Sequence, residues 1–310
     1  MFIGVIAGLA AGFFWGLCLV APKVLADFSS AQIAFGRFFF FGLVSVISLL
    51  ADRNAKQLWN RNTLFWGVIL SLTGYSLYYW MLSQSVQLAG ITTTSLIIGM
   101  IPLTVAVCGR SRPQRMGLFQ FSLLLITLGI LALNYDAIFH PQFSSYGKHH
   151  SLGVILAIAS LWMWTYFAIA NAKFLVRTKV NNVSWTNLLG CLTFLGLGVV
   201  TGPEFLMSEH GYSEMFAGPR APVFLFWSAV LGLGSTWLAT FLWNFCSQRV
   251  PTGLAGQLII SETIFALLFG FIYDERLPIA SEWAAMGFLI AGVLFGVYSF
   301  RNAKRTDAPH

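Results

Sequence analysis

Residues 252–273 read TGLAGQLIISETIFALLFGFIY, an apolar run of 22 residues in which Glu262 is the only charged side chain. A helix of this length extends over about 33 Å at 1.5 Å per residue, which matches the hydrocarbon core of a bilayer. A helix that is apolar on every face is expected in a membrane or deep inside a large core. The run therefore predicts a helix that crosses a membrane.

The rest of the chain has the same character. Of its 310 residues, 57% are hydrophobic and only 9% are charged, whereas soluble domains are about 25% charged. The charged residues gather in short clusters between apolar runs of about 20 residues. This composition excludes soluble globular, disordered, fibrous and disulfide-scaffold proteins, and it predicts an all-α integral membrane protein.

Ten apolar runs predict ten transmembrane helices, which would leave both termini on one side of the membrane. The runs cover residues 2–21, 31–51, 63–83, 88–109, 116–135, 151–171, 183–201, 222–247, 252–273 and 281–300. Thirteen of the 18 Lys and Arg residues lie in connections after even-numbered runs or in the tail, and four lie in the opposite connections. The positive-inside rule then places both termini in the cytoplasm. The first run follows no basic segment and is too long for a signal peptide, so we expect it to be retained.

The two halves of the chain match each other in order. Examples are Trp15 with Trp164 at an offset of 149 residues, Phe40 with Phe194 at 154, Trp66 with Trp227 at 161 and Gly129 with Gly292 at 163. Each half has five runs, an odd number, so the second half must enter the membrane inverted. We expect a first repeat over residues 1–136, an external connector over 137–150, a second, inverted repeat over 151–302 and a cytoplasmic tail over 303–310. Inverted repeats are typical of secondary transporters, whose substrate site lies between the halves near the midplane. A duplicated scaffold is the alternative.

Four stretches resemble a known family over almost the whole chain. They are FFWGLCLVAPKVL at 13–25, AFGRFFFFGLV at 34–44, LAGITTTSLIIGMIPLTVAV at 88–107 and PTGLAGQLIISETIFALLFGFIYDERLP at 251–278. The sequence resembles the drug/metabolite transporter superfamily of the EamA type. The resemblance implies two inverted five-helix halves, each EamA-like, that move small metabolites, often amino acids or related compounds and frequently outward. Where the family has Glu-Pro this chain has Glu262-Thr263, while Pro102 keeps the proline of the first half.

Glu262 is the eleventh residue of its run, close to the bilayer centre. An ionised carboxylate at that depth costs roughly 2.5–3.5 kcal/mol, so the side chain should face the bundle or a wet cavity. In that setting a carboxyl group can carry a proton or bind a cation, which makes Glu262 the proton-coupling candidate. The alternative is a protonated Glu262 that hydrogen-bonds a neighbouring helix.

Arg37 lies about 10 Å from the external end of the second run. Its long side chain could reach the membrane interface. It could instead face inward, where its planar guanidinium would receive a carboxylate. Together Arg37 and Glu262 would fit a zwitterion such as an amino acid.

Aromatic and polar residues at helical spacing complete the predicted substrate site. Three runs contribute such faces, and Trp15 and Trp164 take equivalent places in the two halves. Rings of this kind can stack on apolar or aromatic substrates and hold organic cations, although plain helix packing would give the same spacing. The substrate-binding candidates are Trp15, Arg37, Tyr75, Tyr78, Tyr79, Trp162, Trp164, Tyr166, Trp237, Thr240, Asn244 and Glu262.

Nothing in the sequence predicts an enzyme, a cofactor or a metal site. The four cysteines lie inside apolar runs without metal-ligand or redox spacing, so we interpret them as small apolar residues. The five histidines lie in expected loops or in the tail, and no hydrolase, metalloprotease or phosphate-loop motif occurs. The basic clusters are explained by membrane orientation, so no nucleic-acid partner is expected.

These observations predict a multi-pass secondary transporter of the bacterial inner (plasma) membrane. We expect it to export small amphipathic metabolites, amino-acid-like or aromatic, by alternating access, either coupled to protons or driven by a gradient. A second hypothesis is transport of an organic cation, choline-like or polyamine-like, with Glu262 as its counter-charge. A third is a membrane scaffold that transports nothing. A monomer would suffice for a complete pathway, and a dimer stays open.

Overall fold

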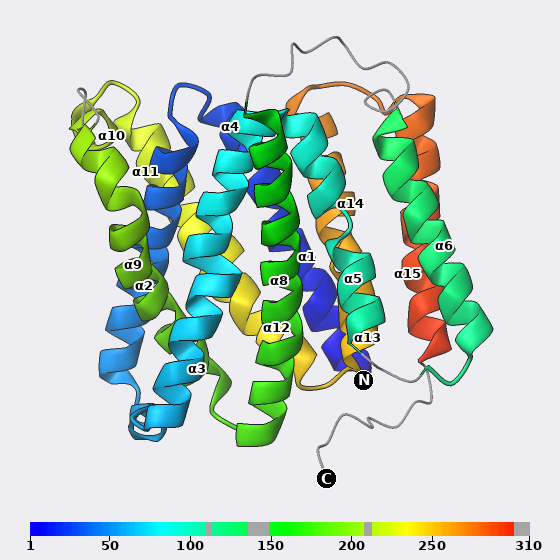
Figure 1. Cartoon of the computed structure of the whole chain (residues 1–310), viewed down its shortest axis with the longest axis horizontal. Helices are drawn as coiled ribbons and strands as arrows, with labels where there is room; N and C mark the ends of the chain where they lie inside the picture. Colours follow the sequence, from blue (N-terminus) through cyan, green and yellow to red (C-terminus); the bar gives the residue numbers. More distant parts are fainter. Residues whose placement is uncertain (110–112, 136–148, 208–212, 301–310) are drawn as a thin grey trace.

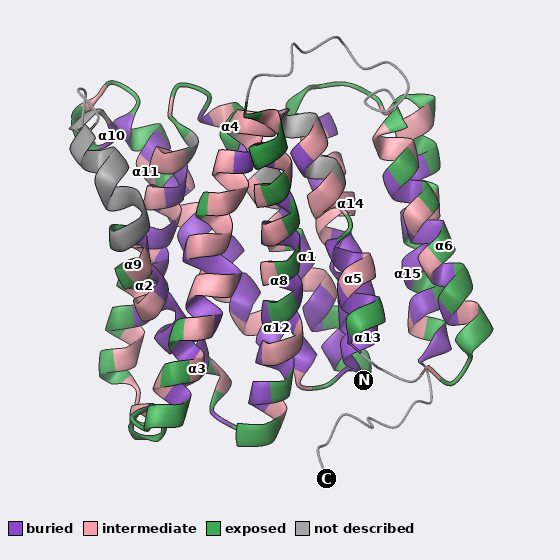
Figure 2. Cartoon of the chain, in the orientation of Figure 1, coloured by how far each residue is buried: buried purple, intermediate pink, exposed green. Residues whose placement is uncertain are grey.

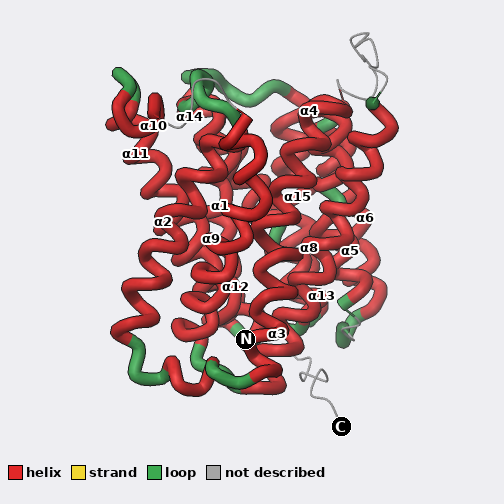
Figure 3. The backbone as a smooth tube through the Cα atoms, turned by 60° about the vertical axis from the view of Figure 1, so that its left-hand side comes forward, coloured by secondary structure: helices red, strands yellow, loops and turns green. Residues whose placement is uncertain are grey.

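The computed structural model describes residues 1–109, 113–135, 149–207 and 213–300, and every regular element within these ranges is a helix (Figure 1). The predicted tail, 303–310, and all but the last two residues of the predicted connector, 137–150, lie outside these ranges. The helices run side by side as one bundle, and Figure 3 shows most of the loops at its two ends.

The elements of the first half are α1 (Phe2–Val24), α2 (Ser30–Ala51), η1 (Ala55–Leu58), α3 (Arg61–Ser71), η2 (Leu72–Ser76), α4 (Leu77–Ile98), α5 (Ile101–Cys108) and α6 (Met116–Leu133). Those of the second half are α8 (His150–Thr178), α9 (Asn182–Met207), α10 (Ser213–Ala217), α11 (Ala221–Ala229), η3 (Val230–Leu238), α12 (Ala239–Ser247), α13 (Thr252–Leu258), α14 (Ile260–Tyr273) and α15 (Ala280–Ser299).

The predicted all-helical membrane fold is confirmed. Seven helices within the described ranges are long and apolar enough to cross a membrane. They are Phe2–Val24, Ala31–Ala51, Met116–Leu133, His150–Thr178, Ala221–Ser247, Thr252–Tyr273 and Ala280–Ser299. The three other predicted runs are helical as well, in α3 to α5 and in α9, but they are not among the seven.

The helix α4 folds back on itself. The hydroxyl groups of Ser85 and Thr94 form a hydrogen bond of 2.8 Å, whereas nine residues of straight helix would separate them by about 13.5 Å. Leu88 and Ala89, which lie at the bend, contact Gly153 at the start of α8. The bend falls where the sequence predicts the connection between the runs 63–83 and 88–109.

Two short stretches are wound as π-helix, which is rare and occurs mostly near functional sites. The first, η2, joins α3 to α4, and the second, η3, joins α11 to α12. The offset of 161 residues that relates the two halves maps Leu72–Ser76 into Val230–Leu238. The periodicity of the sequence gave no sign of either stretch.

The helices pack in pairs that combine the two halves of the chain. The helix α1 packs along α14, α8 along α4, α2 along α9, and α6 along α15. The start of α1 and the end of α15 lie at one end of the bundle, the lower end of Figure 1, and α1 and α14 both finish at the opposite, upper end. Figure 2 shows buried residues on the inner faces of the helices and exposed residues on the outside.

The glycines of α1 allow its close approach to the second half. A Cβ atom at Gly12 would collide with the Ser261 hydroxyl, and one at Gly16 would come within 2.9 Å of the Ala266 backbone nitrogen. Gly4 and Gly8 meet the end of α12 in the same way. Small residues at this four-residue spacing let two helix backbones come close together.

Candidate functional site

Arg37 points into the bundle. Its Nε atom donates a hydrogen bond of 2.7 Å to Oγ1 of Thr236 in the π-helical η3. The guanidinium carbon lies 5.4 Å from the ring centre of Phe38 and 6.0 Å from that of Tyr79. Within the described residues its two terminal nitrogens have no protein acceptor. Of the two orientations open from sequence, the structure therefore favours the inward one.

Glu262 lies in the first turn of α14, just after a break in the predicted run. The regular helix stops at Leu258 and resumes at Ile260, and the Glu262 nitrogen donates to the Ile259 carbonyl at 2.9 Å. In the first half the corresponding break separates α4 from α5 at Gly99 and Met100. The run is thus interrupted although Thr263 replaces the proline typical of the family.

Arg37 and Glu262 share one region without touching. No ion pair or hydrogen bond joins them in the described part of the chain, yet each contributes to the electrostatic field at the other. Both are surrounded by protein, and both keep part of their side-chain surface accessible. We call the region around these two side chains the central site.

Cys18 of α1 belongs to the central site, although the sequence gave it no role. It is half-buried and lies within electrostatic reach of both Arg37 and Glu262. Thr236, the acceptor for Arg37, was also missed. One signal could have found Thr236: it stands four residues before Thr240, on the same face of a helix.

The three tyrosines of η2 and α4 divide between two environments. Tyr78 and Tyr79 are half-buried beside Arg37, as predicted for residues of one site. The Tyr75 hydroxyl is 2.8 Å from the hydroxyl of Thr240, and both side chains are buried. Each satisfies the other, so this pair ties the first half to the second at the edge of the central site.

Trp15 and Trp164 meet, as their equivalent places in the repeats suggest. Their ring centres are 6.1 Å apart, and Trp243 joins them at 5.4 and 6.2 Å. Trp15 is half-buried, whereas Trp164 and Trp243 are buried. The indole nitrogen of Trp237 donates to Asn187 at 2.7 Å, and its ring stacks on Phe241. Trp15 and Trp237 therefore keep accessible surface, while Trp164 acts mainly as a packing partner.

Asn244 does not face the central site, contrary to the prediction. It is fully buried, its oxygen accepts from Asn171 at 2.7 Å and its nitrogen donates to Thr186 at 3.1 Å. Asn171 in turn accepts from the Trp185 indole at 2.8 Å. Because protein groups satisfy the amide on both sides, Asn244 holds α8, α9 and α12 together.

Trp162 and Tyr166 also lie apart from the central site. Trp162 is 52% and Tyr166 45% exposed. They are one turn apart on α8 and stand nearly opposite Trp164, which points inward, because two residues correspond to about 200° of helix rotation. Spacing of the aromatic residues identified a common face correctly but could not tell which face is the inner one.

Within the described residues, no group of three or more His, Cys, Asp or Glu side chains is placed to hold a metal ion. The central site thus offers one cation, one carboxyl group, one thiol and several aromatic rings. This arrangement can bind a small molecule by charge and stacking.

Known proteins resemble this chain in sequence and in fold. Residues 2–135 match the EamA-like transporter family. Over 320 aligned residues the chain is 26% identical to the inner membrane protein YtfF of Escherichia coli (strain K12), with 99% of each protein covered. A protein of known crystal structure is similar over 97% of this chain and 98% of its own, with a TM-score of 0.76 at 15% identity. At that identity the likeness concerns the fold alone.

The family match confirms the resemblance that the four sequence stretches indicate. It covers the half of the chain that holds Arg37, and the likeness to YtfF extends over the half that holds Glu262. The apolar helices agree with a protein that crosses the membrane several times. Residues 2–135 therefore form a domain that matches the EamA-like transporter family, and the chain is a multi-pass membrane protein that is similar to YtfF over nearly its whole length.

Proposed function

We propose that the protein is an inner-membrane secondary transporter that exports small amphipathic metabolites, amino-acid-like or aromatic, by alternating access. One observation carries the proposal: Arg37 and Glu262, opposite in charge and from opposite halves of the chain, line the central site without forming an ion pair. Taking single charges out of water is costly unless a partner compensates them. A zwitterion between the two side chains supplies both partners.

The proposed topology has ten spans in two inverted repeats, residues 1–136 and 151–302, with both termini in the cytoplasm. Its support is the matched placing of the π-helical stretches and of the helix breaks. The packing of α1 on α13 and α14 is mirrored by that of α8 on α4 and α5, as inversion would require. The name of the relative YtfF supports the inner membrane. A single chain contains both halves of the pathway, so a monomer is sufficient.

In the proposed mechanism Arg37 receives the carboxylate of the substrate. Its Nε is held by Thr236, so the two terminal nitrogens are oriented and available for a bidentate bond. Glu262 receives the ammonium group while ionised. It takes up a proton when the substrate leaves, because an ionised carboxylate is costly at this depth. Movement of substrate one way is thereby coupled to movement of a proton the other way.

A second candidate is transport of an organic cation. It is favoured by the ring of Tyr78, which lies within electrostatic reach of Glu262, since aromatic rings attract quaternary ammonium groups. In that case Glu262 alone supplies the counter-charge, and Arg37 is dispensable for binding. The scaffold hypothesis has no structural observation in its favour.

Flux of radiolabelled compounds in sealed proteoliposomes tests the proposal. The panel holds amino acids, aromatic metabolites, polyamines and quaternary amines, each with and without a pH gradient. We expect zwitterions to be moved, and both Arg37→Gln and Glu262→Gln to abolish flux. Matched controls are Arg61→Gln and Glu275→Gln, which remove exposed charges.

Three results would redirect the interpretation. Flux of cations that survives Arg37→Gln but not Glu262→Gln would favour the second candidate. Normal zwitterion flux in both variants would reject the role of the charge pair. If the folded protein moves none of the compounds, the result would favour the hypothesis of a membrane scaffold that transports nothing.

A further inference from the structure

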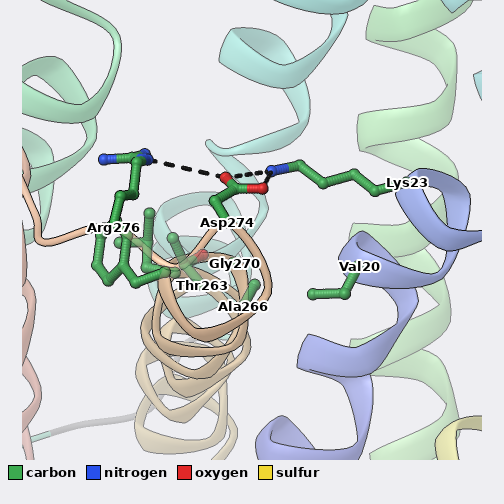
Figure 4. A pocket seen from close by; sticks show the side chains of 9 residues that line it. Val20, Lys23, Thr263, Ala266, Gly270, Asp274 and Arg276 are labelled. Atoms are coloured by element: carbon green, nitrogen blue, oxygen red, sulfur yellow. Dashed lines mark hydrogen bonds and ion pairs between the residues drawn. The ribbon is translucent and has the colours of Figure 1, made fainter.

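At the upper end of the bundle an ion pair joins the last turn of α1 to the end of α14. Lys23 Nζ lies 2.7 Å from Oδ2 and 3.0 Å from Oδ1 of Asp274. Arg276 Nε approaches the same carboxylate at 3.7 Å. Figure 4 shows Lys23 reaching from α1 across to Asp274, with Arg276 on the far side. The ion pair thus bridges the two halves of the chain.

A pocket of about 240 Å³ lies at this ion pair, between α1 and α14. Its lining includes Val20, Lys23, Thr263, Gly270 and Asp274. From Asp274 down to Thr263 the pocket follows about 16 Å of helix. Thr263 is the residue after Glu262, so the pocket extends from the upper end to the depth of the central site.

Deeper in the bundle α1 and α14 approach without a gap. Gly12 meets Ser261 and Gly16 meets Ala266, so the backbones are in contact at these two levels. On α1 the pocket begins above these contacts, at Val20, whereas on α14 it runs past Ala266 down to Thr263. The two helices are therefore held at mid-height by the glycine contacts and at the upper end by the ion pair.

The ion pair can open without leaving Asp274 unpaired, because Arg276 is a second cation beside it. The Lys23 and Asp274 side chains are 48% and 29% exposed, and exposed pairs contribute little to stability. Arg276 donates to both oxygens of Glu282 at 2.7 Å, which keeps it beside Asp274. Hydrogen bonding to Glu282 also raises the pKa of Arg276, so this second cation stays charged. Asp274 would retain Arg276 if Lys23 moved away.

We propose that Lys23 and Asp274 form the external gate of the transport path. Separation of the pair would let the upper ends of α1 and α14 move apart about the glycine contacts. The pocket would then open down to Cys18, Arg37 and Glu262. The inference rests on the proposed transport function, in which the upper end of the bundle faces outward.

Thiol labelling from outside the cell tests the gate. The parent protein keeps Cys18 as its only cysteine, with Cys108, Cys191 and Cys246 changed to Ala, and the probe is a membrane-impermeant maleimide. We expect Lys23→Gln and Asp274→Asn each to raise the labelling rate of Cys18 several-fold. The exchange Lys23→Asp with Asp274→Lys should restore slow labelling, because it reverses the pair without removing it.

A matched control uses a further ion pair at this end, between Arg220 and Asp27. Arg220 donates to the Asp27 carboxylate and to the Val24 carbonyl, and so fixes the end of α1. None of these three residues lines the pocket. Arg220→Gln should leave the Cys18 labelling rate unchanged. An equal rise in this variant would mean that any loosening of α1 exposes Cys18, which overturns the assignment of the gate to Lys23 and Asp274.

A second reporter separates a gate from a mere surface pocket. Thr263→Cys, with Cys18 also changed to Ala, reports on the pocket itself. If the Lys23 and Asp274 variants speed labelling of the Thr263→Cys reporter but not of Cys18, the ion pair covers only the pocket and the proposal is wrong. The proposal is also wrong if neither position is labelled faster. The labelling assay needs no substrate, so it tests the gate independently of the substrate. If Lys23→Gln speeds labelling of Cys18 but the protein moves no zwitterion, the gate stands and the proposed substrate is wrong.

Discussion

The Nε atom of Arg37 donates to the Thr236 hydroxyl at 2.7 Å, and this bond links α2 in the first half to the π-helical η3 in the second. Thr236 also donates to the Leu231 carbonyl, five residues earlier, at 2.8 Å. The hydroxyl is thus fixed as an acceptor for Arg37. The π-helical winding therefore sets the orientation of the guanidinium, and with it the binding geometry for a carboxylate.

Thr236→Val should weaken substrate binding without unfolding the protein. A hydrogen bond to a charged group contributes about 1.5–3 kcal/mol, so we expect the affinity for a carboxylate-bearing substrate to fall about ten-fold or more. The measurement is KM in proteoliposomes. Ser160→Ala is the control, because it likewise removes a buried hydroxyl, one that has no hydrogen-bond partner among the described residues. An unchanged KM in Thr236→Val would show that Arg37 needs no such orientation.

Gly12→Ala should destabilise the contact between α1 and α14. The added Cβ would collide with Ser261 and come within 2.9 Å of the Glu262 nitrogen, and overpacking of this kind costs about 1–3 kcal/mol. The measurement is thermal unfolding in detergent. Gly287→Ala serves for comparison because nothing lies within 4 Å of its added Cβ. Equal melting temperatures for the two variants would contradict the close approach.

Asn244→Leu should lower stability and leave substrate affinity unchanged. The change removes the acceptor for Asn171 and the donor to Thr186, both buried. Buried polar groups left unsatisfied cost about 1–3 kcal/mol each. Unfolding and KM are measured on the same preparation, with the exposed Asn62→Leu as control. A higher KM at unchanged stability would return Asn244 to the substrate site.

Trp162→Ala and Trp15→Ala should differ in their effect on flux. Trp162 is on the outer face of α8, so its loss should leave transport unchanged, whereas Trp15 keeps accessible surface next to the tryptophan cluster. We expect Trp15→Ala to reduce flux several-fold. Flux is compared at equal amounts of monodisperse protein. Equal losses in both variants would argue against the inner and outer faces assigned to α8.

How far the sequence predicts the site depends on the kind of residue. Arg37 and Glu262 were found because a charge within an apolar run is costly and must have a partner or a wet surface. Cys18 and Thr236 were missed because neither side chain is unusual inside a membrane helix. The aromatic residues were grouped correctly by periodicity, but Trp162 and Tyr166 face outward, since spacing fixes a face and not its direction.

The fold was predictable to a similar extent and for similar reasons. The apolar runs anticipate most helix bounds, because a helix satisfies the hydrogen bonds of its backbone within the segment that crosses the bilayer. The π-helical stretches η2 and η3 and the break before Glu262 were not anticipated. They depend on packing between the two halves, for which no local pattern of residues codes.

The fold-back between Ser85 and Thr94 bears on how the chain is inserted during synthesis. Residues 62–109 contain no Asp, Glu, Lys or Arg, and the bend within α4 contains no polar loop that could rest outside between two insertion steps. We therefore expect the two legs to leave the translocon together, as a hairpin. Arg61 and Arg110 lie at the two ends of this hairpin. Their positive charges would keep both ends on the cytoplasmic side of the membrane.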